Sequence, residues 1–215
     1  MATDLLAKAA VSAAVVGLVL ALLHRAGPRA GGLAAAMPVT SMPALFWLAD
    51  ERGGLFAAAA AAGSLWGTLA SALLAWLVGV ALARHAASLP ATVPGGAWRT
   101  GTPVAIAAAG AMSLIVGALS HHAGPGLCGL VAAVPVVAST TTLMAHRQGG
   151  ASTACAFLRG YLDGMLAKAV FLVTLGSAWT AGAGAAAWPL ALSAAAVALL
   201  AQRSLQPARG VRNDG

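Results

Sequence analysis

The chain has 215 residues, of which 60% are apolar, 8% are charged and 5% are aromatic, and its formal net charge is +7. Soluble domains carry about 25% charged residues, so this composition excludes a water-soluble globular domain, a disordered chain and a nucleic-acid-binding protein. The mean hydropathy of +0.87 instead indicates an all-α, multi-pass membrane protein. Its expected partner is therefore the lipid bilayer.

Seven apolar stretches follow one another along the chain, and about 20 helical residues suffice to cross a bilayer. The seven spans are expected at 5–23, 30–48, 55–82, 103–120, 127–145, 153–178 and 183–201. Residues 5–23 form too long an apolar run for a signal peptide, so we interpret them as the first transmembrane helix. Residues 83–102 contain Pro90 and Pro94 and are expected to form a cytoplasmic linker. Residues 202–215 are expected to form a basic cytoplasmic tail.

The basic residues indicate how the chain is oriented. Eight arginines fall in loops that seven spans would place on one side, namely Arg25, Arg29, Arg84, Arg99, Arg147, Arg203, Arg209 and Arg212. Positive charge is retained on the cytoplasmic side, so we expect the N-terminus outside and the C-terminus inside, in a cell inner membrane. Cys128 and Cys155 would then lie in opposite membrane halves, and we expect no disulfide between them.

Comparison of the chain with itself indicates a tandem duplication. A shift of 97 residues aligns residues 24–28 with residues 121–125, including a histidine, a glycine and a proline in each copy. The first copy covers residues 1–82 and the second covers residues 103–178, each with three spans. Because three is odd, the second copy would enter the membrane from the other side. This predicts a 3+3 inverted-topology repeat, as in secondary transporters, followed by a seventh helix at 179–201.

Short motifs recur in both copies. The first copy has Gly32 and Leu33, then Pro38, then Ala49-Asp50-Glu51-Arg52-Gly53, and later Leu65 and Trp66; the second copy keeps Gly129, Leu130 and Pro135. This pattern resembles the GlpM-like family of small bacterial inner-membrane proteins. The resemblance implies a two-copy form of a single-copy family with envelope-related roles, and it carries over no catalytic residue. The second copy departs from it, with His146-Arg147-Gln148 in place of the acidic turn.

Prolines near the middle of the second and fifth spans mark the first candidate site. Pro38 and Pro135 each lack a backbone donor and free a carbonyl at membrane depth. Hydroxyl side chains follow both prolines: Thr40 and Ser41 in the first copy, and Ser139, Thr140, Thr141 and Thr142 in the second. Such groups can hold a small polar solute or a cation, as in the interrupted helices of carriers. The alternative is a packing kink whose hydroxyls bond back to their own helix, and the sequence leaves both open.

The sixth span contains three charged residues, Arg159, Asp163 and Lys168. Charges inside a span usually face the bundle interior or a water-filled cavity. Arg159 and Asp163 are four residues apart and can pair on one helix face, whereas Lys168 needs another partner or water. The first copy has uncharged residues at the corresponding positions, namely Ala62, Trp66 and Ser71. A proton- or solute-coupling site and a structural buried pair both explain this asymmetry.

Two glycines of the third span recur in the sixth: Gly63 and Gly67 match Gly160 and Gly164. Small residues let membrane helices approach closely. We therefore expect these four glycines to mediate helix packing, with the third and sixth spans crossing near the pseudo-two-fold axis.

Together these patterns predict a carrier or exporter of a small polar or ionic solute, with a midplane site between the repeats. Such a carrier should have a solvated cavity lined by residues 139–142 and Asp163. The alternative is a non-transporting accessory protein of an envelope polysaccharide or lipid pathway, which should be packed shut there.

Catalytic motifs are missing from the sequence. It contains no HExxH, nucleophile elbow, phosphate loop or paired carboxylates, so we expect no enzyme activity, no cofactor and no metal. A small solute or a proton is the expected ligand. A homodimer or another membrane protein as partner stays open.

Overall fold

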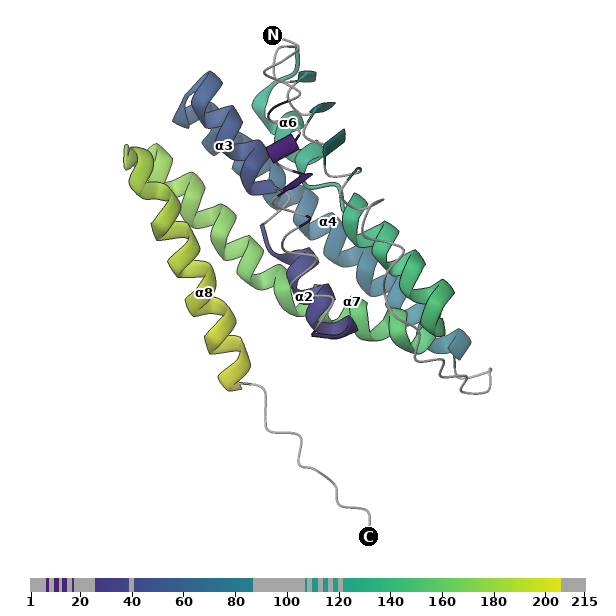
Figure 1. Ribbon diagram of the computed structural model, residues 1–215. Coiled ribbons are helices and arrows are strands. Elements are labelled where there is room, and N and C mark those ends of the chain that lie inside the picture. The colour runs from purple at the N-terminus through teal and green to yellow at the C-terminus, as the bar shows by residue number, and fades with distance from the viewer. Residues whose placement is uncertain are drawn as a thin grey trace.

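The computed structural model describes residues 26–38, 41–86 and 122–205, together with isolated helical positions between 7 and 17 and between 107 and 119. All regular secondary structure in these residues is helical (Figure 1). The elements are α2 (Pro28–Ala36), α3 (Ser41–Arg52), α4 (Gly54–Ala86), α6 (Pro125–Ala132), α7 (Val136–Thr180), the short 3-10 helix η1 (Gly184–Ala186) and α8 (Ala187–Leu205). The predicted all-helical fold class is confirmed for this part of the chain.

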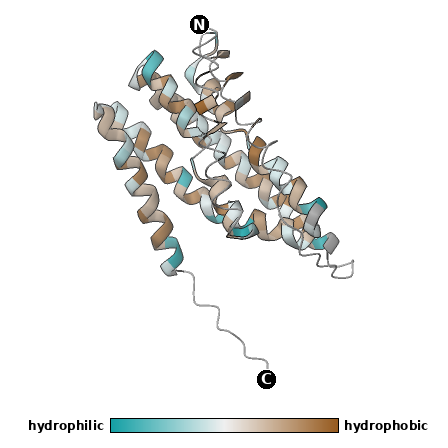
Figure 2. Cartoon of the chain, viewed as in Figure 1, coloured by the Kyte–Doolittle hydropathy of each residue, from teal (hydrophilic) through white to brown (hydrophobic). Residues whose placement is uncertain are grey.

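Five described stretches are long and apolar enough to cross a membrane: Pro28–Arg52, Gly54–Arg84, Pro125–Arg147, Gly149–Thr180 and Gly184–Ser204. They correspond to the second, third, fifth, sixth and seventh predicted spans. Figure 2 shows hydrophobic residues along most of these helices. The first and fourth predicted spans, and most of the linker and tail, lie outside the described residues.

The helix α4 extends slightly beyond the predicted third span. The linker was expected to begin at residue 83, but α4 continues as a helix through Ala86. Residues 83–86 are alanine, arginine, histidine and alanine, which favour or tolerate a helix, and the first proline of this region comes only at residue 90.

Both predicted prolines interrupt a span. α2 ends at Ala36 and α3 begins at Ser41, with Pro38 between them; α6 ends at Ala132 and α7 begins directly after Pro135. Each proline carbonyl accepts the first backbone hydrogen bond of the next helix, from the N–H of the residue four positions later. The O···N distance is 2.6 Å at Pro38 and 2.8 Å at Pro135. The proline carbonyls are therefore used within the chain to begin a new helix.

A turn at a glycine ends the helix that begins after each proline. Gly53, between α3 and α4, has a φ of 85°, and Gly150, inside α7, has a φ of 71°. Other residues are strained in this left-handed region. Gly150 divides α7 into two helices, residues 136–149 and residues 151–180. Since the two glycines are 97 residues apart, each copy has the same order: short helix, proline break, helix, glycine turn, long helix.

The helix packing also follows the 97-residue shift. A side chain on Gly32 of α2 would collide with the backbone of Phe157 and Tyr161 in α7. A side chain on Gly129 of α6 would collide with the backbone at residues 60 and 64 of α4, which are the corresponding positions. The short helix of each copy thus packs closely on the long helix of the other copy.

The larger hydrophobic core joins α3, α4, α7 and α8. Leu45 of α3 and Phe171 and Leu175 of α7 are completely buried in it. Trp179 of α7 meets Trp188 of α8 edge to face, with 5.2 Å between the ring centroids. This packing holds α8 against the long part of α7, a contact that the first copy has no helix to reproduce within the described residues.

Candidate functional site

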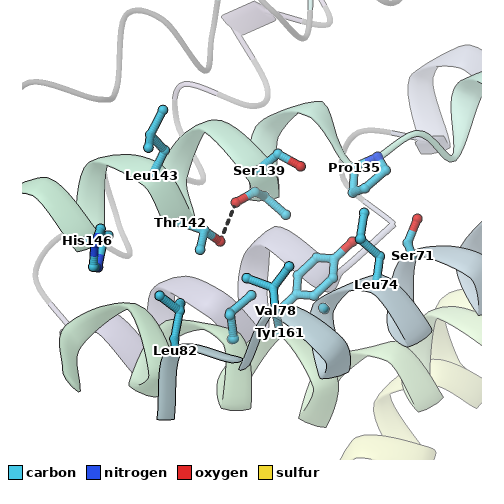
Figure 3. Close-up of a pocket in the computed structure, with 13 residues that line it drawn as sticks. Ser71, Leu74, Val78, Leu82, Pro135, Ser139, Thr142, Leu143, His146 and Tyr161 are labelled. Atoms are coloured by element: carbon cyan, nitrogen blue, oxygen red, sulfur yellow. Dashed lines mark hydrogen bonds between the residues drawn. The ribbon is translucent and has the colours of Figure 1, made fainter. Parts of the chain in front are cut away.

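A cavity of about 280 Å³ lies beside the break at Pro135, between α4 and both parts of α7 (Figure 3). We refer to it as the Pro135 cavity. Its walls are mostly apolar, and α4 contributes Leu74, Val78 and Leu82. Its polar side chains are Ser71, Ser139, Thr142, His146 and Tyr161. In Figure 3, Pro135 and Ser71 lie at one end of the cavity and His146 and Leu82 at the other.

The hydroxyls that follow Pro135 are only partly available to a solute. Thr140 donates to the carbonyl of Val136 at 2.9 Å, and Thr141 and Thr142 each donate at 2.7 Å to the carbonyl four residues earlier. This is the arrangement expected of a packing kink. Ser139 and Thr142 nevertheless line the cavity, whereas Thr140 and Thr141 do not. A hydroxyl that donates to its own helix still has lone pairs that can accept a hydrogen bond from a solute.

Two buried hydroxyl side chains, of Ser71 and Tyr161, line the Pro135 cavity. The Ser71 hydroxyl donates to the carbonyl of Gly67 at 2.7 Å and approaches that of Ala133 at 3.3 Å. The Tyr161 side chain, only 3% exposed, also lines the cavity. The sequence identified Ser71 only as the counterpart of Lys168 and His146 only as part of the turn that departs from the family pattern, and it did not identify Tyr161. Tyr161 is the only tyrosine of the chain, and its place inside an apolar span was a signal that could have identified it.

The corresponding region beside Pro38 is filled. The positions related to Leu74, Val78 and Leu82 by the 97-residue shift carry Phe171, Leu175 and Trp179, and all three are buried. The Ser41 hydroxyl, also buried, lies 3.5 Å from the carbonyl of Pro38. Thr40, the other polar residue predicted here, lies outside the described residues. Two breaks of the same design thus differ in packing, with one beside a cavity and one inside a core.

The charges of the sixth span do not pair as expected. Asp163 binds Arg29 of α2, with 2.8 Å between Nη2 and Oδ2 and 3.2 Å between Nε and Oδ2, whereas the predicted partner Arg159 is exposed. The reason is the close approach at Gly160, where a side chain would collide with the backbone carbonyl of Arg29. This approach places the Arg29 side chain on the helix face that carries Asp163.

Asp163 and the hydroxyls after Pro135 therefore belong to different places. Asp163 lines a second hollow, together with residues of α2 and α8, and not the Pro135 cavity. Lys168 is 4% exposed and has neither a hydrogen bond nor an ion pair with any residue of the described part. It occupies the position in the second copy that Ser71 occupies in the first. The predicted single site lined by residues 139–142 and Asp163 is not formed.

The four repeated glycines all face a short helix of the other copy: Gly63, Gly67, Gly160 and Gly164. A Cβ atom on Gly67 would lie 2.6 Å from the Cβ of Ala133, and one on Gly164 would lie 2.7 Å from the Cβ of Ala36. They thus allow α4 to approach α6 and α7 to approach α2. Contacts between α4 and α7 involve another glycine, since the Cys155 thiol lies 3.8 Å from the carbonyl of Gly79.

Cys128 and Cys155 form no disulfide bond with each other, as expected, and both are free thiols. No cluster of metal-binding side chains occurs among the described residues. His24 and His121, which align in the two copies, lie outside them.

Comparisons with known proteins found no protein-family model, no curated protein and no solved structure that matches this chain. The function is therefore argued from the residues of the chain itself.

Proposed function

We propose that this protein is a membrane carrier that binds a small solute in the Pro135 cavity. The observation that supports the proposal is the unequal packing of two equivalent proline breaks. The break at Pro135 borders a cavity, whereas at the equivalent positions of the second copy Phe171, Leu175 and Trp179 are buried in the larger core with Leu45 of α3, the helix that follows Pro38. A carrier built from two related halves is open on one side at a time, and a difference of this kind is what such a carrier requires.

The direction of opening depends on the topology. The proposal adopts the seven-span, inner-membrane arrangement with the N-terminus outside that the sequence predicts. The proposal takes the cavity to open at its end beside His146 and Leu82, which lie close in sequence to Arg147 and Arg84; retention of positive charge assigns these arginines to the cytoplasm. The described conformation would then be open toward the cytoplasm, and the packed break at Pro38 would close the outer side.

Exchange of conformation between the two copies would open the other side. The short helices α2 and α6 are the elements to move, because each is bounded by a proline break and rests on a long helix through glycine contacts. Gly53 and Gly150 supply flexible turns at equivalent positions. Few-residue hinges of this kind commonly absorb the backbone change when elements move against each other.

The walls of the Pro135 cavity indicate the class of solute. Among the residues that the structure describes, no Asp, Glu, Lys or Arg side chain lines it, and its polar groups are hydroxyls and the His146 imidazole within an apolar surface. A volume of 280 Å³ lies just below the range of about 300 to 1,000 Å³ common for ligand pockets. A small uncharged solute with a few hydrogen-bonding groups fits these walls better than an ion.

Lys168 is the residue proposed for coupling to protons. Arg159 is exposed and Asp163 is paired outside the cavity, which leaves Lys168 among the charges of the sixth span. It takes the place of Ser71 in the second copy. In an outward-open conformation, Lys168 would therefore line the cavity of the other copy as Ser71 lines the Pro135 cavity now.

Site-directed labelling of cysteines tests the conformational change. In a background with Cys128→Ala and Cys155→Ala, Ser139→Cys should react with a membrane-impermeant thiol reagent from the cytoplasmic side of inverted vesicles. Ser41→Cys, the position beside the packed break, should be protected there and should react slowly from the outer side. If both positions are labelled from the same side, or neither is ever labelled, the two breaks do not open alternately.

Solute flux in proteoliposomes, with and without a proton gradient, distinguishes a carrier from the accessory-protein alternative. A carrier should equilibrate small uncharged polar solutes, and Ser139→Trp should stop this flux by filling the cavity. Absence of flux across a panel of such solutes, with the labelling pattern above also absent, would favour a non-transporting protein. The resemblance to GlpM-like proteins remains a proposal beside both readings.

A further inference from the structure

A second hollow, of about 360 Å³, lies among α2, α7 and α8 and shares no lining residue with the Pro135 cavity. Its polar lining consists of Arg29, Asp163, Gln202 and Arg203. We propose that this hollow, the Arg203 pocket, binds an anionic oxygen group of the phosphate class. The inference does not depend on the proposed carrier function.

The charges of the pocket favour an anion. Two guanidinium groups, of Arg29 and Arg203, face one carboxylate, of Asp163, which leaves one positive charge in excess. Arg29 uses Nε and Nη2 on a single carboxylate oxygen, and its Nη1 has no acceptor within the described part. Arg203 is exposed and forms no hydrogen bond or ion pair with the described residues. Guanidinium groups match the spacing of phosphate oxygens with paired N–H donors.

The backbone adds donors to the same pocket. Arg29 and Ala30 of the first turn of α2 line it, and the helix has no side-chain cap at Gly27. The first N–H groups of a helix have no partner within the helix, and they carry a partial positive charge that attracts anions. The α2 terminus thus supplements the two arginines.

Gln202 supplies an independent sign of a ligand. Its Oε1 atom is buried and has no hydrogen-bond partner in the part of the chain that the structure describes. Burial of an unpaired polar atom is unfavourable. Rotation of the amide would turn this atom toward the pocket, where a protonated phosphate oxygen, or a hydroxyl next to the phosphate, would supply the missing donor.

The position of the pocket along the spans indicates where the phosphate would come from. The apolar span of α8 ends at Ser204, and that of α2 begins at Pro28, so the pocket lies where both helices leave the apolar layer. Basic pockets between helices at this level bind anionic lipid headgroups. The same chemistry also fits free phosphate from solution.

Binding by the full-length protein in detergent tests the inference with two probes, dioctanoyl phosphatidic acid and inorganic phosphate. Affinity is measured from the ligand dependence of thermal unfolding and, for the lipid, by native mass spectrometry. Arg203→Gln should weaken binding of phosphatidic acid about tenfold, because it removes a charge-assisted contact. Arg159→Gln is the matched control, since it removes the same charge from an exposed position of α7 that does not line the pocket.

The two probes separate the sources. Loss of lipid binding in Arg203→Gln, with no phosphate binding in either protein, assigns the pocket to a lipid headgroup. Loss of both assigns it to the phosphate group itself, and each result supports the inference. Equal affinities of Arg203→Gln and Arg159→Gln for both probes, or no binding of either probe to the unmodified protein, would overturn it. Unfolding temperatures without ligand verify that both variants are folded.

Discussion

Arg29 of α2 and Asp163 of α7 lie 134 residues apart in the sequence and form an ion pair with 2.8 Å between Nη2 and Oδ2. The pair joins the short helix of the first copy to the long helix of the second. At the positions related by the 97-residue shift, α6 and α4 carry Gly126 and Trp66, which cannot pair. The contact between α2 and α7 thus includes an ion pair, whereas the equivalent contact between α6 and α4 includes a hydrogen bond from the Ser64 hydroxyl to the carbonyl of Gly129 at 2.8 Å.

The contribution of this pair to stability should be small. The Arg29 side chain is 61% exposed, and exposed pairs contribute about 0 to 1 kcal/mol because solvent screens them. A double-mutant cycle with Arg29→Gln and Asp163→Asn, followed by denaturant unfolding in detergent, should give a coupling within that range. The same cycle with Arg159→Gln should give no coupling. A coupling of Arg159 to Asp163 as large as that of Arg29 would contradict the observed pairing.

Close packing of α6 on α4 predicts that any side chain at Gly129 destabilises the protein. Gly129→Ala should lower the free energy of unfolding by at least about 1 to 3 kcal/mol, because the new methyl group collides with the α4 backbone at Ala60 and Ser64. Thermal unfolding in detergent measures the loss. Gly126→Ala, on the same helix, is the control, since open space surrounds that position. Equal stability of the two variants would show that α6 does not lie this close to α4.

Filling the Pro135 cavity should stop transport without unfolding the protein. Leu74→Phe introduces the residue that the second copy has at the corresponding position, Phe171. We expect solute flux to fall at least about tenfold and stability to rise by up to about 1 kcal/mol, as cavity-filling substitutions often do. Leu77→Phe is the control on the same helix, at an equally exposed position that does not line the cavity. Flux that survives Leu74→Phe would place the solute path elsewhere.

Replacement of Lys168 separates a functional charge from a structural one. Lys168→Met should leave stability unchanged or raise it, because an apolar side chain of similar length replaces a buried ammonium group. If Lys168 couples transport to protons, flux in proteoliposomes should lose its dependence on a proton gradient. Arg159→Met, at an exposed position of the same helix, should keep that dependence. If flux through the Lys168→Met protein still depended on the proton gradient, Lys168 would not be the coupling residue.

The proline breaks illustrate what can be predicted from sequence. Proline lacks the N–H that helix continuation needs, so interruptions at Pro38 and Pro135 follow from local chemistry alone. The four repeated glycines were predicted in the same way, as residues recurring at one offset, whereas the turns at Gly53 and Gly150 were not predicted. The helix against which each glycine packs could not be predicted, because it depends on the packing of each copy's short helix on the long helix of the other copy.

The ion pair was mispredicted for a related reason. Spacing along a helix identified Arg159 as a neighbour of Asp163, and this was the best partner within one element. Arg29 reaches Asp163 only because the lack of a side chain at Gly160 allows α2 to lie against α7. Contacts between distant segments require knowledge of which helix faces meet, and sequence periodicity in a uniformly apolar helix does not contain it.

By itself, the sequence determined the helical membrane-type architecture, the duplication and the places where helices break, since hydropathy, proline and glycine act locally. Only the tertiary structure decided that one break borders a cavity and the other a core. The deciding difference is the volume of three residues of α4 compared with Phe171, Leu175 and Trp179 of α7. The volume of a side chain fills the space beside a break only if that side chain faces the break, and the packing of the helices determines which side chains do.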